Sequence, residues 1–120
     1  MNRLLAHLLS FSQIPVLNSA PLILENKTST KNNWVKIDLI GTRSTRDAVG
    51  SLVTVRTNQK KLVQEVHRGR GYQSHYGSSM FFGLADAKEI TEIEVRWHGG
   101  GKQVISSPSM NSTIRIHQVE

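Results

Sequence analysis

The sequence predicts an all-β fold, either an antiparallel β-sandwich or a partly open barrel of about seven short strands. Short stretches with a hydrophobic period of two recur along the chain, and turn residues separate them. No stretch after Pro21 keeps a helical period over ten residues. The clearest strand is 91–98, where three apolar residues expected to be buried alternate with three charged residues expected to be solvated: Ile93, Val95 and Trp97 against Glu92, Glu94 and Arg96.

The first predicted strand covers residues 33–40. Val35, Ile37 and Leu39 alternate with polar residues, which predicts one buried face. Trp34 falls on the opposite face, so we expect it to be exposed or at a sheet edge. A loop bounded by glycines, Gly41 to Gly50, follows this strand.

The next two predicted strands form a hairpin. Residues 52–56 place Val53 and Val55 inward, and Asn58-Gln59-Lys60 supplies the turn. The partner strand, 62–67, separates its apolar and polar faces less clearly. A long loop with glycines and tyrosines, 69–79, comes after it.

The second half of the chain completes the predicted sheets. An apolar strand at 80–84 and a turn at 86–90 precede strand 91–98. Gly99-Gly100-Gly101 then predicts a turn into strand 102–106, and the last strand lies in 113–119. These patterns predict a core made of Val35, Ile37, Leu39, Val53, Val55, Phe82, Leu84, Ile93, Val95, Trp97, Ile114 and Ile116.

Length and composition fit one ordinary domain. The chain has 120 residues, no cysteine and no apolar run approaching the ~18–20 residues that span a bilayer. The net charge of +6 is concentrated in residues 31–70, which hold nine Lys or Arg against three Asp or Glu. Such an excess attracts phosphates or acidic glycans, although a solvated basic face is the simpler interpretation.

Residues 1–20 allow two interpretations. Arg3 precedes an apolar stretch from Leu4 to Phe11, as in a secretory signal, but polar residues interrupt that stretch. The favoured alternative is the tail of a preceding module, with the β-domain covering residues 21–120.

No catalytic or metal-binding motif stands out. The five histidines have no ligand spacing, and no Gly-x-Ser-x-Gly elbow is present. Asp38, Asp47 and Asp86 lie in or beside loops, but no calcium-loop motif contains them. We therefore expect a domain without catalytic residues, cofactor or metal.

Five segments resemble the ASPIC/UnbV domain: LILEN, NWVKIDLIGTRSTRDAVG, GRGYQS, MFFGLADA and IEVRWHGG. The resemblance implies a non-catalytic extracellular, periplasmic or cell-surface β-domain that follows a propeller of FG-GAP/VCBS repeats in a longer parent chain. This chain departs from the usual pattern at four places. Thr45 stands where Asn is usual, Ser51 where Ala is usual, Ala85 where Gly is usual, and His98-Gly99 where Pro-Ser is usual.

The loop Gly41–Gly50 is the strongest candidate site, with two interpretations. In the structural one, Asp47 accepts backbone N–H bonds of the loop and Gly50 allows a bulge. In the functional one, basic and aromatic residues of two facing loops bind a glycan or a protein: Arg43, Arg46, Arg68, Arg70, Tyr72 and Tyr76.

Two other functions remain as alternatives to an interaction or structural module. One is an accessory role in a biosynthetic enzyme pathway, which only the resemblance suggests. The other is nucleic-acid binding, which only the charge suggests. It ranks last, because basic motifs interleaved with aromatic residues are missing.

Overall fold

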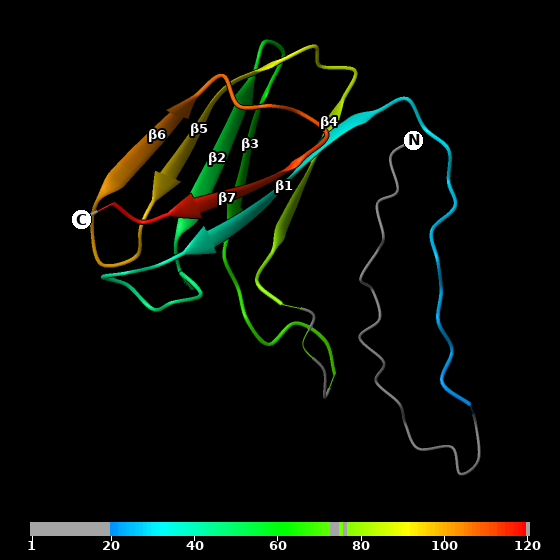
Figure 1. Ribbon diagram of the computed structural model, residues 1–120, viewed down its shortest axis with the longest axis horizontal. Helices are drawn as coiled ribbons and strands as arrows, with labels where there is room; N and C mark the ends of the chain where they lie inside the picture. The colour runs from blue at the N-terminus through cyan, green and yellow to red at the C-terminus, as the bar shows by residue number, and fades with distance from the viewer. Residues whose placement is uncertain (1–19, 73–74, 76, 120) are drawn as a thin grey trace.

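The computed structural model describes residues 20–72, 75 and 77–119 and shows two β-sheets without a closed barrel (Figure 1). The predicted β-sandwich is confirmed, and the seven predicted strands are present with ends shifted by at most two residues. The interpretations offered for residues 1–19 fall outside the described residues. The strands are β1 (Asn33–Ile40), β2 (Leu52–Thr57), β3 (Lys61–Glu65), β4 (Met80–Ala85), β5 (Ile90–Arg96), β6 (Lys102–Ser106) and β7 (Thr113–His117).

The strands form a small sheet in the order β4-β1-β7 and a large sheet in the order β3-β2-β5-β6. Four of the five pairings are antiparallel. The fifth, β1 with β7, is parallel, so the small sheet is mixed. The parallel pair brings the last strand beside the first and places the ends of both at one edge of the sandwich.

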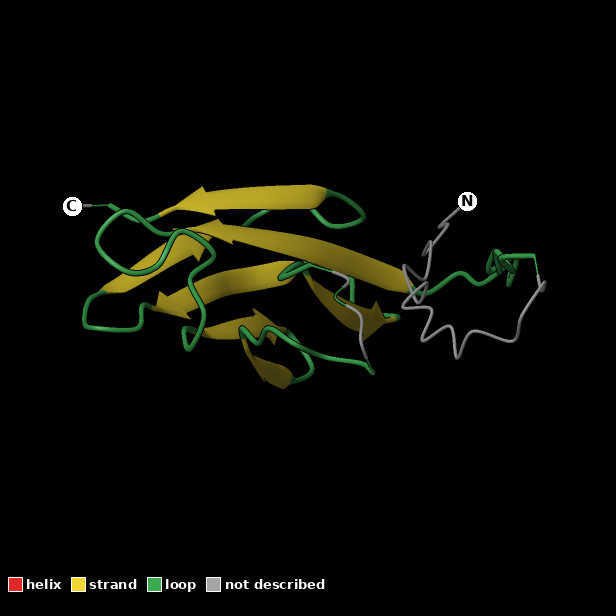
Figure 2. Cartoon of the chain, turned by 90° about the horizontal axis from the view of Figure 1, so that it is seen from below, coloured by secondary structure: helices red, strands yellow, loops and turns green. Residues whose placement is uncertain are grey.

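The buried hydrophobic residues form one core cluster to which strands of both sheets contribute. Figure 2 shows the strands turned by 90° from the view of Figure 1. Eleven of the twelve predicted core residues are buried, and Ile114 is half-buried against them. Alternation explains this result, because each strand directs every second side chain inward. The prediction omitted Ala48, Val66, Met80, Ala87 and Ile90, which lie at strand ends or in loops and are also buried.

One prediction about the outer face was wrong. Glu94 was expected to be solvated, but only 8% of it is exposed. It occupies the middle of a row across the large sheet, Val63–Thr54–Glu94–Val104, so neighbours cover it on both sides. Three cations surround its carboxylate: Lys102 at 3.3 Å, Arg56 at 3.6 Å and Arg96 at 3.7 Å.

Two glutamines join the sheets at the two open sides of the sandwich. Gln64 and Gln103 lie at opposite ends of one inward-facing row, Gln64–Val53–Val95–Gln103. The Gln64 amide donates to the backbone carbonyl of Phe81 on β4 at 2.8 Å, and that of Gln103 donates to His117 on β7 at 3.2 Å. Each bond therefore links an edge strand of one sheet to an edge strand of the other.

Residues 20–32 run away from the sheets, on the side opposite the C-terminus (Figures 1 and 2). Leu22, Ile23 and Leu24 in this segment are exposed by 61%, 76% and 63%. The described residues contain no helix long and apolar enough to cross a membrane.

Candidate functional site

The loops that carry the motifs lie at one end of the sandwich. Leu52, which opens β2, pairs with Glu65 at the end of β3 and Arg96 at the end of β5. At the same end β1 and β7 finish together, with Ile40 beside His117. Register within each sheet, together with the bonds from loop 41–51 to Gln118, brings four segments together. They are loop 41–51, the start of loop 66–79, turn 97–101 and the residues after β7; we call this the loop end.

Gln118, which is 7% exposed, fixes the first half of the signature loop. Its side-chain carbonyl Oε1 accepts the backbone N–H groups of Thr42, Arg43 and Ser44 at 3.0–3.1 Å. It also accepts the Ser44 hydroxyl at 3.1 Å. The Gln118 backbone N–H donates to the backbone carbonyl of Ile40, so Gln118 is itself held at the end of β1.

Backbone bonds fix the second half of the loop. Gly41 N–H donates to Arg46, Ala48 N–H to Thr45, and Ser51 N–H to Ala48. Gly50 has a φ of +85°, a conformation that favours glycine. A Cβ there would also lie 2.9 Å from the His98 ring, so a larger residue would have to displace that ring. Hydrogen bonds to Gln118 and within the loop therefore fix the backbone conformation of loop 41–51.

Asp47 pairs with Arg68 of the facing loop, both side chains being partly exposed. The N–H groups that Asp47 was expected to accept are accepted instead by Gln118 among the described residues. Nothing in the sequence near the loop indicates this, because Gln118 lies more than seventy positions away.

Neither of the two hollows described below is lined by more than one of the five described candidate binding residues. Arg68 pairs with Asp47, and Arg46 and Tyr72 are exposed without joining either hollow described below. Tyr76 lies outside the described residues. Of the described candidates, Arg43 lines one of these two hollows and Arg70 lines the other.

The first hollow, of about 510 Å³, lies at the loop end between the triple-glycine turn and the residues after β7; we call it the loop-end hollow. Its charged or titratable lining groups among the described residues are Arg43, His98 and Lys102; none is a carboxylate, but Lys102 is paired with Glu94 outside the lining. The amides of Gln103 and Gln118 and the indole of Trp97 complete it. Such a lining favours an anionic ligand.

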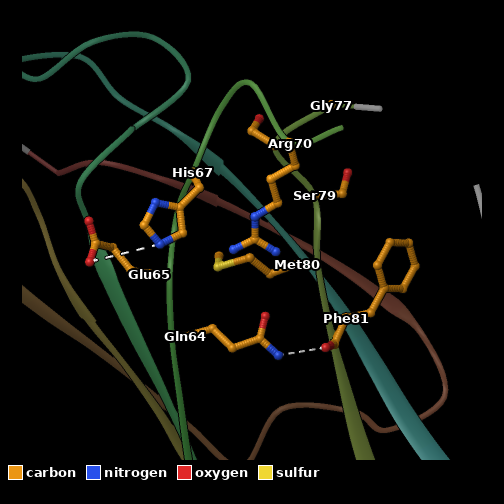
Figure 3. A pocket seen from close by; sticks show the side chains of 9 residues that line it. Gln64, Glu65, His67, Arg70, Gly77, Ser79, Met80 and Phe81 are labelled. Carbon is orange, nitrogen blue, oxygen red and sulfur yellow. Dashed lines mark hydrogen bonds and ion pairs between the residues drawn. The ribbon is translucent and has the colours of Figure 1, made fainter. Parts of the chain in front are cut away.

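The second hollow, of about 440 Å³, lies between edge strands β3 and β4; we call it the side cleft. Figure 3 shows Arg70 reaching into it toward Met80, with His67 on one wall and Ser79 on the other. Glu65 lies 4.0 Å from His67, and the Gln64–Phe81 bond closes one end. Both hollows have volumes typical of small-ligand sites.

No group of three or more His, Cys, Asp or Glu side chains that could hold a metal occurs in the described part of the chain. The loop serines are already engaged, since Ser44 bonds Gln118 and the Ser51 hydroxyl accepts the His98 backbone N–H at 3.0 Å. The arrangement is thus suited to binding by side chains on a fixed backbone.

Comparison with known proteins gives one finding. The family model described as "ASPIC and UnbV" matches residues 41–120, two-thirds of the chain, whereas no curated protein matches. The matched range begins just after β1, although β1 is the central strand of the small sheet. The match contains both sides of the loop end, from the signature loop to Gln118. The chain therefore belongs to the ASPIC and UnbV family.

Proposed function

We propose that this domain is a non-catalytic extracellular or cell-surface module that binds an acidic glycan or protein through its loop end. The observation that carries the proposal is the loop-end hollow, where Arg43 and His98 line one space and no described lining residue is a carboxylate, while Lys102 in the same lining is paired with Glu94. Arg43 is exposed and forms no ion pair with a described residue, so its charge is available to a ligand.

The backbone under Arg43 supports this role. Gln118 accepts the N–H groups of Arg43 and of both its neighbours, so the arginine projects from a fixed position. Binding then costs less conformational entropy than it would from a mobile loop. Non-specific attraction by a basic patch does not need a backbone held by hydrogen bonds in this way.

We further propose that an upstream module, such as a propeller of FG-GAP/VCBS repeats in a longer parent chain, contacts residues 20–26. Leu22, Ile23 and Leu24 are consecutive and exposed. Exposed apolar runs of this kind mark protein–protein contacts. This arrangement leaves the loop end, on the other side of the domain, free for a ligand.

The test is chromatography on immobilised acidic glycan, with neutral glycan of the same backbone as the reference column. We expect retention that falls steeply with salt, and loss of retention in Arg43→Ala. Lys31→Ala is the matched control, because it removes one exposed cation away from the loop end. Equal loss in both variants, or stronger retention on single-stranded DNA of similar charge density, would reject the proposal.

A further inference from the structure

We infer that the side cleft is a separate binding site for a carboxylated sugar, such as a uronate, with Arg70 as the carboxylate receptor. This inference rests on the proposed glycan-binding function but concerns a different surface. The cleft lies beside β3 and β4, and Arg70 is the one described lysine or arginine that lines it.

The charge of Arg70 is not neutralised within the described residues. Its guanidinium points into the cleft in Figure 3, and no ion pair or hydrogen bond joins it to a described group. This contrasts with Arg68, two positions earlier, which pairs with Asp47. A guanidinium presents a planar fork of donors that fits a carboxylate in a bidentate manner.

The remaining lining suits hydroxyl groups. The side-chain amide nitrogen of Gln64 is used by Phe81, which leaves its carbonyl oxygen as an acceptor at the floor of the cleft (Figure 3). Glu65 is another acceptor, and Ser78, which also lines the cleft, can both donate and accept. Met80 lies beneath Arg70 and belongs to the hydrophobic core, since only 4% of it is exposed.

The charge balance selects among anions. The cleft is lined by one arginine that has no ion pair with a described residue and by the carboxylate of Glu65, which repels a ligand that carries several negative charges. A ligand with one carboxylate and several hydroxyls satisfies both groups. A uronate has this chemistry, and a neutral hexose lacks the partner for Arg70.

The floor of the cleft is rigid. Gln64 lies on β3 and Met80 on β4, where Met80 pairs with Ile37 of β1. The Gln64–Phe81 bond ties the two edge strands together directly below Arg70. The side-chain amide of Gln64 is therefore a natural reporter of occupancy.

The experiment is an NMR titration of the isotope-labelled chain with methyl β-D-glucuronide, followed at the Gln64 side-chain amide. Methyl β-D-glucoside is the neutral matched ligand, and inorganic sulfate is the simple-anion probe. We expect saturable shifts with the glucuronide and affinity at least about tenfold weaker for the glucoside, since a charge-assisted pair contributes this much. Arg70→Ala should remove binding, Arg70→Lys should weaken it, and Lys88→Ala, at an exposed position that lines neither hollow, should leave it unchanged.

Equal binding of glucuronide and glucoside, equal binding of sulfate, or unaltered binding in Arg70→Ala would each overturn the inference. Arg70 is exposed, so the melting temperature of Arg70→Ala should match the parent and confirm folding. Column retention that depends on Arg43, together with no glucuronide shift at Gln64, would reject the side-cleft site alone and leave the proposed function intact.

Discussion

The buried hydroxyl of Ser51 accepts a hydrogen bond from the backbone N–H of His98 at 3.0 Å. Ser51 is fully buried and lies immediately before β2, and His98 follows β5. These are two of the positions at which the chain departs from the usual family pattern, which has Ala and Pro there. A proline has no N–H and an alanine has no hydroxyl, so the two departures match each other.

This pairing predicts that the two positions are energetically coupled. Ser51→Ala leaves the His98 N–H unbonded, and His98→Pro leaves a buried hydroxyl without its donor, each costing about 1–2 kcal/mol. The double variant needs no bond, so its cost should fall below the sum by about 1 kcal/mol. Urea unfolding of the four proteins measures the coupling. Strictly additive costs would show that the bond contributes nothing.

The signature loop should depend on Gln118 more than on Asp47. Gln118→Ala removes the acceptor of three backbone N–H groups and one hydroxyl and should lower the free energy of unfolding by about 1–3 kcal/mol. Asp47→Ala removes a partly exposed ion pair with Arg68, worth about 0–1 kcal/mol. Urea unfolding compares the two variants.

Gln118→Glu is the matched control, because a carboxylate keeps an acceptor in the same place. It should retain slow hydrogen exchange at Arg43 and Ser44, which Gln118→Ala should lose. If Asp47→Ala proves the more destabilising variant, then Asp47 and not Gln118 holds the loop.

The strands could be predicted from sequence because their signal is local. Val35, Ile37 and Leu39 alternate with polar residues, and the neighbouring side chains decide which face is buried. The mixed small sheet could not be predicted, because β1 and β7 are separated by most of the chain and their pairing direction leaves no local trace.

The candidate site was harder to predict because its geometry depends on contacts between distant segments. Arginines in two facing loops suggested one basic surface, but Asp47 uses Arg68, and Arg43 and Arg70 line different hollows. The burial of Glu94 likewise follows from its row in the sheet. Gln64 and Gln103 did carry a signal, since each is a polar residue at an inward position of an edge strand.

Ala85→Gly should stabilise the domain. Ala85, at the end of β4, has a φ of +52°, and it stands where the family pattern has glycine. A left-handed conformation costs an L-residue about 1–2 kcal/mol, and the greater freedom of glycine in the unfolded chain offsets about 0.5–1 kcal/mol. We expect a net gain of about 0.5–1 kcal/mol, measured by urea unfolding.

Ala87→Gly is the control for Ala85→Gly. Ala87 is fully buried, lies two residues further along, and is not among the described residues with positive φ. The same replacement there should therefore destabilise the domain. Loss of stability in both variants would mean that the backbone at Ala85 carries no strain.

The lowered pKa of Glu94 predicts that the domain becomes less stable in acid. Its hydrogen bond with Lys102 is the main reason that its pKa lies below the ordinary value of 4.5, and the charges of Lys102, Arg56 and Arg96 act in the same direction against partial burial. A group whose pKa is lowered by folding stabilises the folded state above its unfolded pKa. That contribution is lost as the pH falls through the folded pKa. The melting temperature of the parent should therefore fall as the pH is lowered below about 4.5.

Glu94→Gln should be less stable than the parent at pH 7, and the difference should shrink toward pH 3. Glu89→Gln, at an exposed position, is the control and should follow the parent at every pH. A parent and a Glu94→Gln variant that stay equally far apart from pH 7 to pH 3 would show that the ionised carboxylate does not stabilise the sheet.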